Sequence, residues 1–323
     1  MIKRIKITLS LSVRAALYML VLIAVFFLDI IKGKFFSRGP EKSITGSLSS
    51  LLFFNMSFGS EAIRNSIYHP RNIEYPLVIN RLNARKDTIV LDIGSGRSLP
   101  PFYLVKEGAK VCCLDLDENF MVLKDYAYKH GFKNYVENKR LNIEIGDARN
   151  LPFPDNYFDR VYAISTIEHI PNDGDISAVK EIARVLKPEG IAVLTVDCLG
   201  DYLEEWQRVP FFSGYQYEKE ISEQSSKSSG KKENPYSFFI RFYDKKSMNE
   251  RLIIPSQLKL VESGFYGERF NIRHYFNPGV NKFIERFFYW SQPLVSALFY
   301  KKLKETDELE NFFGIIGYIV LKK

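Results

Sequence analysis

The feature that most constrains this chain is a regular alternation of short apolar runs and helix-like stretches between Asp87 and Cys198. The apolar runs are TIVLDIG, KVCCLDLD, NIEIGDA, FDRVYAIST and GIAVLTVDC, and LPPFYLVKEG, NFMVLKDYAYKHG and ISAVKEIARVLKPEG lie between them with helical spacing. Strands that alternate with helices form a parallel sheet covered on both faces. We therefore expect an α/β fold.

Three acids fall where predicted strands end. Asp92 closes the first strand, Asp115 the second and Asp147 the third. In an open parallel sheet these ends meet along one edge, where ligands bind. Gly94 and Gly96 follow the first acid, and glycines let the backbone approach a ligand closely. The sequence therefore predicts a ligand site at this edge.

The spacing of these residues narrows the class of ligand. Asp115 lies 21 residues after Gly94, a separation typical of an acid that binds ribose hydroxyls. A dinucleotide turn reads G-x-G-x-x-G, but GSGRSL places Leu99 at the third glycine position. Asp92 would also repel a pyrophosphate, whereas it would attract an ammonium and a sulfonium. The pattern therefore disfavours NAD.

Four motifs in order resemble those of class I S-adenosylmethionine-dependent methyltransferases, in particular the small-molecule, type 11-like branch. They are VLDIGSG, LDLDENF, GDARNLPFPDNYFDRVYAISTIEHI and ARVLKPEGIAVLTV, within residues 87–196, about a third of the chain. The resemblance implies S-adenosyl-L-methionine as cofactor and a Rossmann-like, mostly parallel sheet. With the closing GIIGYIVLKK it implies seven strands, the last antiparallel.

The resemblance assigns the cofactor's methionine and ribose parts to the first two motifs. Gly94 and Gly96 would line both parts, and Asp92 would face the methionine amine. Asp115 would bind the ribose hydroxyls, with Leu116 beside it in the cofactor site. In one respect the sequence departs from the family, because GRSLPP stands where a further small residue often follows the second glycine.

The later motifs supply the rest of the predicted site. Asp147 would accept from the adenine amino group, Ala148 would offer backbone contact, and Ser165 would lie beside the methionine part. His169, in the pair Glu168–His169, is a weak candidate for a catalytic base. Because a methyl transfer from a sulfonium is a direct displacement, proximity and alignment can supply most of the rate without a protein base. No metal site is expected.

The N-terminus carries a candidate membrane anchor, assigned to residues 1–38. Ala15 to Ile31 forms an apolar run of 17 residues, about 25 Å as a helix, at the short limit for a membrane span. Basic residues flank both ends, so charge gives no orientation. A helix in the membrane interface, a signal peptide and a buried core helix are the alternatives.

The remaining chain is divided by composition. Residues 39–86 are expected to form a linker and a helical cover interrupted by Pro70 and Pro76, and residues 87–323 the methyltransferase domain. Within the latter, residues 199–246 contain a polar, Ser- and Lys-rich stretch that predicts a mobile insertion. Residues 281–303 predict an amphipathic helix, which either packs on the sheet or forms a membrane contact or an apolar acceptor wall.

The net charge and the cysteine spacing limit which classes of binding partner are plausible. The net charge of +7 suits an anionic membrane surface, an acidic substrate or a nucleic acid, although base composition of the gene would also explain many lysines. A nucleic-acid methyltransferase is disfavoured, because STIEHI stands where an Asn-Pro-Pro-Tyr-type motif is expected. Cys112, Cys113 and Cys198 show no zinc spacing and predict buried free thiols.

The sequence thus predicts a membrane-anchored methyltransferase whose catalytic domain lies on the cytoplasmic side, where the cofactor is made. A lipid-like or lipid-linked acceptor would suit the anchor. The alternatives are a methyltransferase of a soluble metabolite or protein and a cofactor-binding scaffold without catalysis, against which the intact acids argue. The acceptor atom and the oligomeric state stay open.

Overall fold

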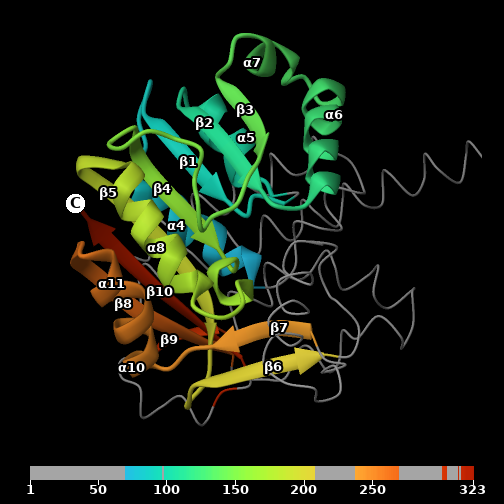
Figure 1. Ribbon diagram of the computed structural model, residues 1–323. Helices are drawn as coiled ribbons and strands as arrows, with labels where there is room; N and C mark the ends of the chain where they lie inside the picture. Colours follow the sequence, from blue (N-terminus) through green and yellow to red (C-terminus); the bar gives the residue numbers. More distant parts are fainter. Residues whose placement is uncertain (1–69, 97, 208–236, 269–299, 304–311, 313) are drawn as a thin grey trace, which may run out of the picture.

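The structure is a computed structural model, and it describes residues 70–96, 98–207, 237–268, 300–303, 312 and 314–323. Figure 1 shows a twisted sheet with helices on both faces. Its strands are β1 (Ile89–Ile93), β2 (Lys110–Asp115), β3 (Leu141–Ile145), β4 (Phe158–Ile164), β5 (Leu186–Cys198), β8 (Lys259–Glu268), β9 (Tyr300–Leu303) and β10 (Ile315–Lys322).

The strand order across the sheet is β3-β2-β1-β4-β5-β10-β8-β9. Strands β1 to β5 run parallel, and β10 lies antiparallel between β5 and β8. The order reverses between β1 and β4, which places the ends of β1, β2 and β4 around one crevice. The predicted α/β fold and the antiparallel last strand are confirmed.

Helices cover the two faces of the sheet with separate apolar cores. On one face lie α4 (Arg71–Leu82), α5 (Pro100–Lys106) and α6 (Val122–Lys129), and on the other α8 (Gly174–Val185) and α11 (Ile254–Ser256). The remaining elements are η1 (Glu118–Met121), α7 (Lys133–Glu137), η2 (Ile167–His169), α10 (Lys245–Met248) and η3 (Asn249–Ile253). Buried residues alternate between the faces along β1, where Val90 belongs to one core and Leu91 to the other.

The sheet has eight strands in the described residues, one more than the seven predicted. The extra strand, β9, ends the segment that we expected to be an amphipathic helix at residues 281–303. Its four residues pair with the free edge of β8, Phe265 with Leu303 through Glu268 with Tyr300, so edge pairing overrides the helical pattern. Residues 281–299 lie outside the described residues.

A second, two-stranded sheet occupies both ends of the predicted mobile insertion. Strands β6 (Leu203–Gln207) and β7 (Ser237–Phe242) pair antiparallel, and residues 208–236 between them lie outside the described residues. Tyr243 bridges to Cys198 at the end of β5, which fixes this hairpin at the carboxyl edge of the main sheet (Figure 1). The insertion is therefore ordered at its base.

Two further predictions concern single elements. Helix α4 begins after Pro70 and continues through Pro76, so the expected interruption at Pro76 is wrong; its buried residues, such as Leu77 and Val78, hold the helix on the sheet. The three cysteines are buried free thiols, as predicted.

The predicted membrane segment lies outside the described residues. In the part of the chain that the structure describes, no helix has the length and apolar character needed to cross a membrane.

Candidate functional site

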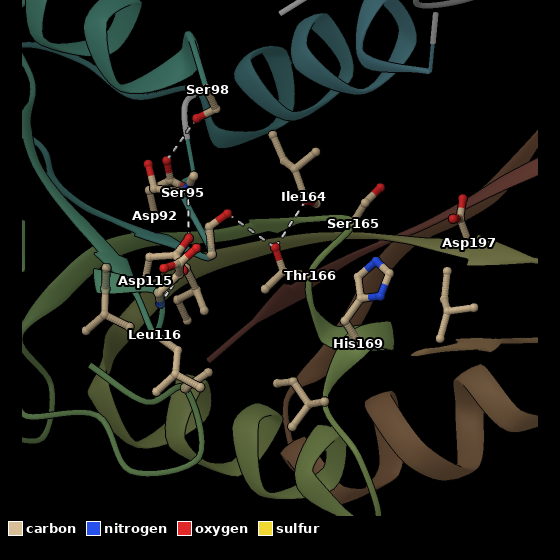
Figure 2. Close-up of a pocket in the computed structure, with 18 of the residues that line it drawn as sticks. Asp92, Ser95, Ser98, Asp115, Leu116, Ile164, Ser165, Thr166, His169 and Asp197 are labelled. Atoms are coloured by element: carbon tan, nitrogen blue, oxygen red, sulfur yellow. Dashed lines mark hydrogen bonds between the residues drawn. The ribbon is translucent and has the colours of Figure 1, made fainter. Parts of the chain in front are cut away.

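A cavity of about 770 Å³ opens at the carboxyl ends of β1, β2 and β4, within the size range of cofactor and small-molecule sites. Figure 2 shows Asp115 and Leu116 at one end, with Asp92 and Ser95 above them, and Ser165, His169 and Asp197 at the opposite end. Of the predicted site residues, these line the cavity: Asp92, Gly94, Gly96, Asp115, Leu116, Ala148, Ser165 and His169.

The turn after β1 places its two glycines in the left-handed region, with φ of +66° at Gly94 and +48° at Gly96. The Gly94 amide donates to the Leu114 carbonyl oxygen over 2.8 Å, which draws the turn against β2. A Cβ on Gly94 would lie 2.1 Å from the Thr166 side chain, whereas a Cβ on Gly96 would have no atom within 4 Å. Gly94 therefore permits close packing, and Gly96 leaves space for a ligand.

Replacing Gly94 with alanine should destabilise the protein by about 3 kcal/mol or more, because left-handed strain adds to the clash with Thr166. Gly131 is a matched control, since it has φ of +85° but a Cβ added there would meet no atom within 4 Å. Gly131→Ala should cost only about 1 kcal/mol. Urea unfolding of both variants measures the difference, and equal losses would contradict the close-packing role of Gly94.

Asp92 is a buried carboxyl group at the end of β1, with only 2% of its surface exposed. Burial raises its pKa to about 7, and neighbouring hydroxyls offset part of the increase. Ser98 donates to its Oδ2 over 3.5 Å, and the buried Ser95 and Tyr162 hydroxyls are the other neighbouring groups that favour its ionised form. Asp92 lines the cavity, and its pairing with the methionine amine stays a prediction.

The residues after the glycine turn, where the sequence departs from the family pattern, lead into helix α5. Ser98 lines the cavity, and Leu99 is buried in the apolar core that α4, α5 and α6 cover. Pro100 and Pro101 occupy the first turn of α5, where backbone amides have no intrahelical partner. Leu99, at the third glycine position, is thus followed directly by a helix start that the two prolines fix.

Asp115 lies at the end of β2, and its oxygens organise two backbone segments. Oδ2 accepts from the Gly96 amide over 2.9 Å and Oδ1 from the Asp117 amide over 3.0 Å. Burial raises its pKa, and these amides lower it in part. Each carboxylate oxygen retains a second lone pair, so Asp115 can bind a diol at this end while it also fixes the glycine turn.

Asp147 does not reach the cavity. Its carboxylate pairs with the Arg149 guanidinium at 2.7 Å, and the neighbouring Gly146 and Ala148 line the cavity instead. An aspartate two residues from an arginine can fold back on it, which the strand-end pattern does not reveal. The assignment of Asp147 to the adenine amino group therefore stays a prediction, and the lining residues on either side of it are Gly146 and Ala148.

The opposite end of the cavity depends on a buried glutamate from α4 that the sequence analysis missed. Glu74 is 1% exposed and accepts from the Ser165 and Thr195 hydroxyls over 2.6 and 2.7 Å and from Arg71 over 2.6 Å. Arg71 and Tyr75 of the same helix line the cavity. An acid on the otherwise apolar face of α4 was the only signal in the sequence.

His169 lies in the cavity wall with its Nδ1 2.8 Å from the Phe239 carbonyl oxygen. Burial lowers its pKa to about 4, so the ring is neutral at pH 7 and Nδ1 donates to the carbonyl. This contact ties η2 to β7. The catalytic role suggested by the sequence stays a prediction, whereas the contact gives His169 a structural role.

A second buried acid, Glu168, lies next to the cavity. It is fully buried, its Oε1 accepts from the Asp197 amide over 3.3 Å, and its Oε2 has no partner among the described residues. Burial, followed by the charge of Asp197, raises its pKa well above the usual range. Asp197 itself lines the cavity (Figure 2), which adds an acid to this end.

The β6–β7 hairpin, which lies within the insertion expected at residues 199–246, supplies the last wall. Glu205 of β6 and Phe239, Ile240 and Phe242 of β7 line the cavity beside Ile170. One end of the cavity is thus formed by the acids and glycines of β1 and β2, and the other by an insertion with mainly apolar side chains. Such a cavity can hold two ligands end to end.

Comparisons with known proteins concern the part of the chain that forms the first end of the cavity. Residues 91–194 match the family model described as a methyltransferase domain. A sterol 24-C-methyltransferase of Gibberella zeae is 41% identical over 32% of this chain and 26% of its own length. The methyltransferase GfsG of Streptomyces halstedii is 33% identical over 34% and 38%, respectively. A demethylmenaquinone methyltransferase of Staphylococcus epidermidis is 30% identical over 44% and 57%.

The chain thus spans from about a quarter to just over half of the length of these relatives. Among solved structures, a phosphoethanolamine N-methyltransferase of Haemonchus contortus in complex with S-adenosylhomocysteine covers 88% of this chain and 58% of its own, with 15% identity and a TM-score of 0.48. Residues 91–194 therefore match a methyltransferase domain, and this match supports S-adenosylmethionine as the cofactor.

Proposed function

We propose that the whole chain is an S-adenosylmethionine-dependent methyltransferase, anchored to a membrane by its N-terminal segment, that methylates a lipid-like or lipid-linked small molecule at the cytoplasmic face. The observation that carries the proposal is a continuous cavity with two unlike ends. Asp92, Gly96 and Asp115 form one end, and β7 forms the other.

The first end fits the cofactor by its chemistry. Asp115 offers oxygens to the ribose diol, Asp92 offers a carboxylate to the ammonium, and Gly96 leaves room for the chain between them. When bound, the cofactor would supply a methyl group on a sulfonium; a nucleophile of the acceptor would bond to the methyl carbon as the carbon–sulfur bond breaks and the sulfur leaves as a thioether. The residues contribute by holding the two reactants in line, which accounts for large rate gains without acid–base catalysis.

The second end supports an acceptor with an apolar body. Tyr75, Ile170, Phe239, Ile240 and Phe242 line it. Two of the relatives are named for sterol and demethylmenaquinone methylation, and their similarity to this chain is consistent with such an acceptor. The polar groups at the same end, Arg71 and Asp197, would contact the part of the acceptor that carries the nucleophile.

The membrane location rests on the sequence. The apolar run from Ala15 to Ile31 lies between basic flanks, which favour an anionic membrane surface. An anchored enzyme meets a lipid-like acceptor without extracting it into water. The catalytic domain is assigned to the cytoplasmic side because the cofactor is made there.

The proposal is tested by incubating the purified full chain with methyl-labelled cofactor and with separated membrane and soluble extracts. Label should enter a solvent-extractable lipid in the membrane fraction. A chain without residues 1–38 should move to the soluble fraction and label dispersed lipid less efficiently. The control is the Asp115→Ala chain, which should transfer no label.

Each other outcome has a definite meaning. Label in the soluble fraction would indicate a metabolite or protein acceptor, and transfer to neither fraction with intact cofactor binding would support a non-catalytic scaffold. Persistence of the shortened chain on membranes would show that residues 1–38 are not the anchor.

A further inference from the structure

The base of the β6–β7 hairpin is built around a fully buried guanidinium, that of Arg241. Its Nε donates to the Tyr202 hydroxyl over 2.9 Å and to Glu204 over 3.1 Å. Its two terminal nitrogens donate to the carbonyl oxygens of Ile170 over 3.1 Å and Asn172 over 2.7 Å. Every nitrogen of the guanidinium is therefore satisfied.

These contacts join segments that are far apart in the sequence. Tyr202 and Glu204 belong to the start of the hairpin, whereas Ile170 and Asn172 belong to the connection between η2 and α8. Arg241 also lies 3.3 Å from Asp175 at the start of α8. One side chain thus fixes the insertion to the core of the methyltransferase domain.

The groups that Arg241 joins are also walls of the cavity. Its neighbours on β7, Ile240 and Phe242, line the acceptor end, and so does Ile170, whose carbonyl oxygen it binds. The cofactor end is built from β1 and β2, which contribute none of these partners of Arg241. A shift of the hairpin would therefore move the acceptor end of the cavity and leave the cofactor end unchanged.

We propose that Arg241 is a positioning residue for the methyl acceptor: it holds the β6–β7 hairpin against the η2–α8 connection and so sets the acceptor wall. The inference rests on the proposed function, because it names the β7 end of the cavity as the acceptor end. A second tie, from His169 to the Phe239 carbonyl oxygen, acts on the same strand.

The surroundings of Asp175 explain why loss of Arg241 should release the hairpin without unfolding the domain. Asp175 also accepts from Arg251 over 2.8 Å and from the Tyr243 hydroxyl over 2.8 Å. Its charge therefore stays compensated in Arg241→Met, so the large penalty of an unpaired buried ion is avoided. The contacts to Tyr202, Glu204 and the two carbonyl oxygens are lost.

The test compares Arg241→Met and the milder Glu204→Gln with a matched control, Arg184→Met. Arg184 also binds two carboxylates and two carbonyl oxygens, those of Glu181, Asp155, Phe153 and Leu151, but it lies near the C-terminal end of α8. Its loss should cost stability of the same kind without touching the acceptor wall. Label transfer is measured against increasing amounts of membrane extract, with S-adenosylhomocysteine binding by calorimetry.

For Arg241→Met, the half-saturating amount of extract should rise about tenfold or more, while maximal transfer and S-adenosylhomocysteine affinity stay within about threefold. Glu204→Gln should shift half-saturation in the same direction by less, and Arg184→Met should not shift it. Amide exchange should accelerate in β6 and β7 of Arg241→Met and not in β1.

A rise in half-saturation for Arg184→Met equal to that for Arg241→Met would overturn the proposal, because general destabilisation would then explain both. An unchanged half-saturation in Arg241→Met with faster exchange in the hairpin would also overturn it. If the wild-type chain transfers no label but binds S-adenosylhomocysteine, the proposed function fails instead. Unchanged amide exchange in β6 and β7 of Arg241→Met would separately refute the role of Arg241 in holding the hairpin.

Discussion

Asp115→Ala should weaken S-adenosylmethionine binding about 100-fold, close to 3 kcal/mol, in calorimetry at pH 7.5. The substitution removes the carboxylate that we propose binds the ribose diol of the cofactor. It also removes the acceptor for the Gly96 and Asp117 amides, so the glycine turn loses its tie to β2. The first loss removes a contact with the cofactor and the second loosens the wall around it, so both reduce affinity.

A suitable control for this experiment is Asp125→Ala on the exposed side of α6. It removes the same charge from the same domain without altering the cavity. Its affinity for the cofactor should match that of the wild type. Cofactor binding by Asp115→Ala at wild-type affinity would remove the ribose assignment and, with it, the main support for the cofactor end of the cavity.

Asp92→Asn should stabilise the free protein while it abolishes tight cofactor binding. Burial raises the pKa of Asp92 from 3.8 to about 7, so the folded protein holds a proton that the unfolded chain releases between these values. The stability contributed by this proton is present at low pH and falls as pH rises toward 7. Above pH 7 the buried charge costs about 2–4 kcal/mol, which the asparagine avoids.

Thermal or urea unfolding between pH 5 and 8 checks this prediction. The wild type should lose stability with rising pH, and Asp92→Asn should show a smaller loss over the same range. Cofactor affinity should move in the opposite direction, because an ammonium prefers the ionised carboxylate: wild-type affinity should fall below pH 7 by up to about tenfold per unit. A wild-type affinity independent of pH would contradict the pairing of Asp92 with the ammonium.

The central sheet could be predicted from the sequence because its strands are short apolar runs that end in acids or glycine. The acids at two of those ends, Asp92 and Asp115, line the cavity as expected. Asp147 does not, since a local partner, Arg149, takes its carboxylate. The position of an acid at a strand end thus predicts where its backbone lies in the sheet, but not which neighbour its carboxylate contacts.

The acceptor end could not be predicted in the same way. Some partners of Glu74 and Arg241 lie about 70 to 120 residues away in the sequence, among them Thr195 for Glu74 and Ile170 for Arg241. Their roles depend on how α4 and the hairpin dock on the sheet, and no local pattern encodes that docking. The helix predicted where β9 lies is wrong for a related reason, because the conformation of β9 follows from pairing with β8.

The contacts of Glu74 change where the functional unit of this chain begins. Composition alone places the domain boundary at residue 87, yet Glu74 satisfies the hydroxyls of Ser165 and Thr195 at the cavity. A fragment that starts at residue 87 would leave those two hydroxyls without this acceptor and open the cavity on the side of α4. Any shortened version of the chain, whether for expression or for grafting onto another acceptor module, should therefore keep everything from Pro70 onward as one piece.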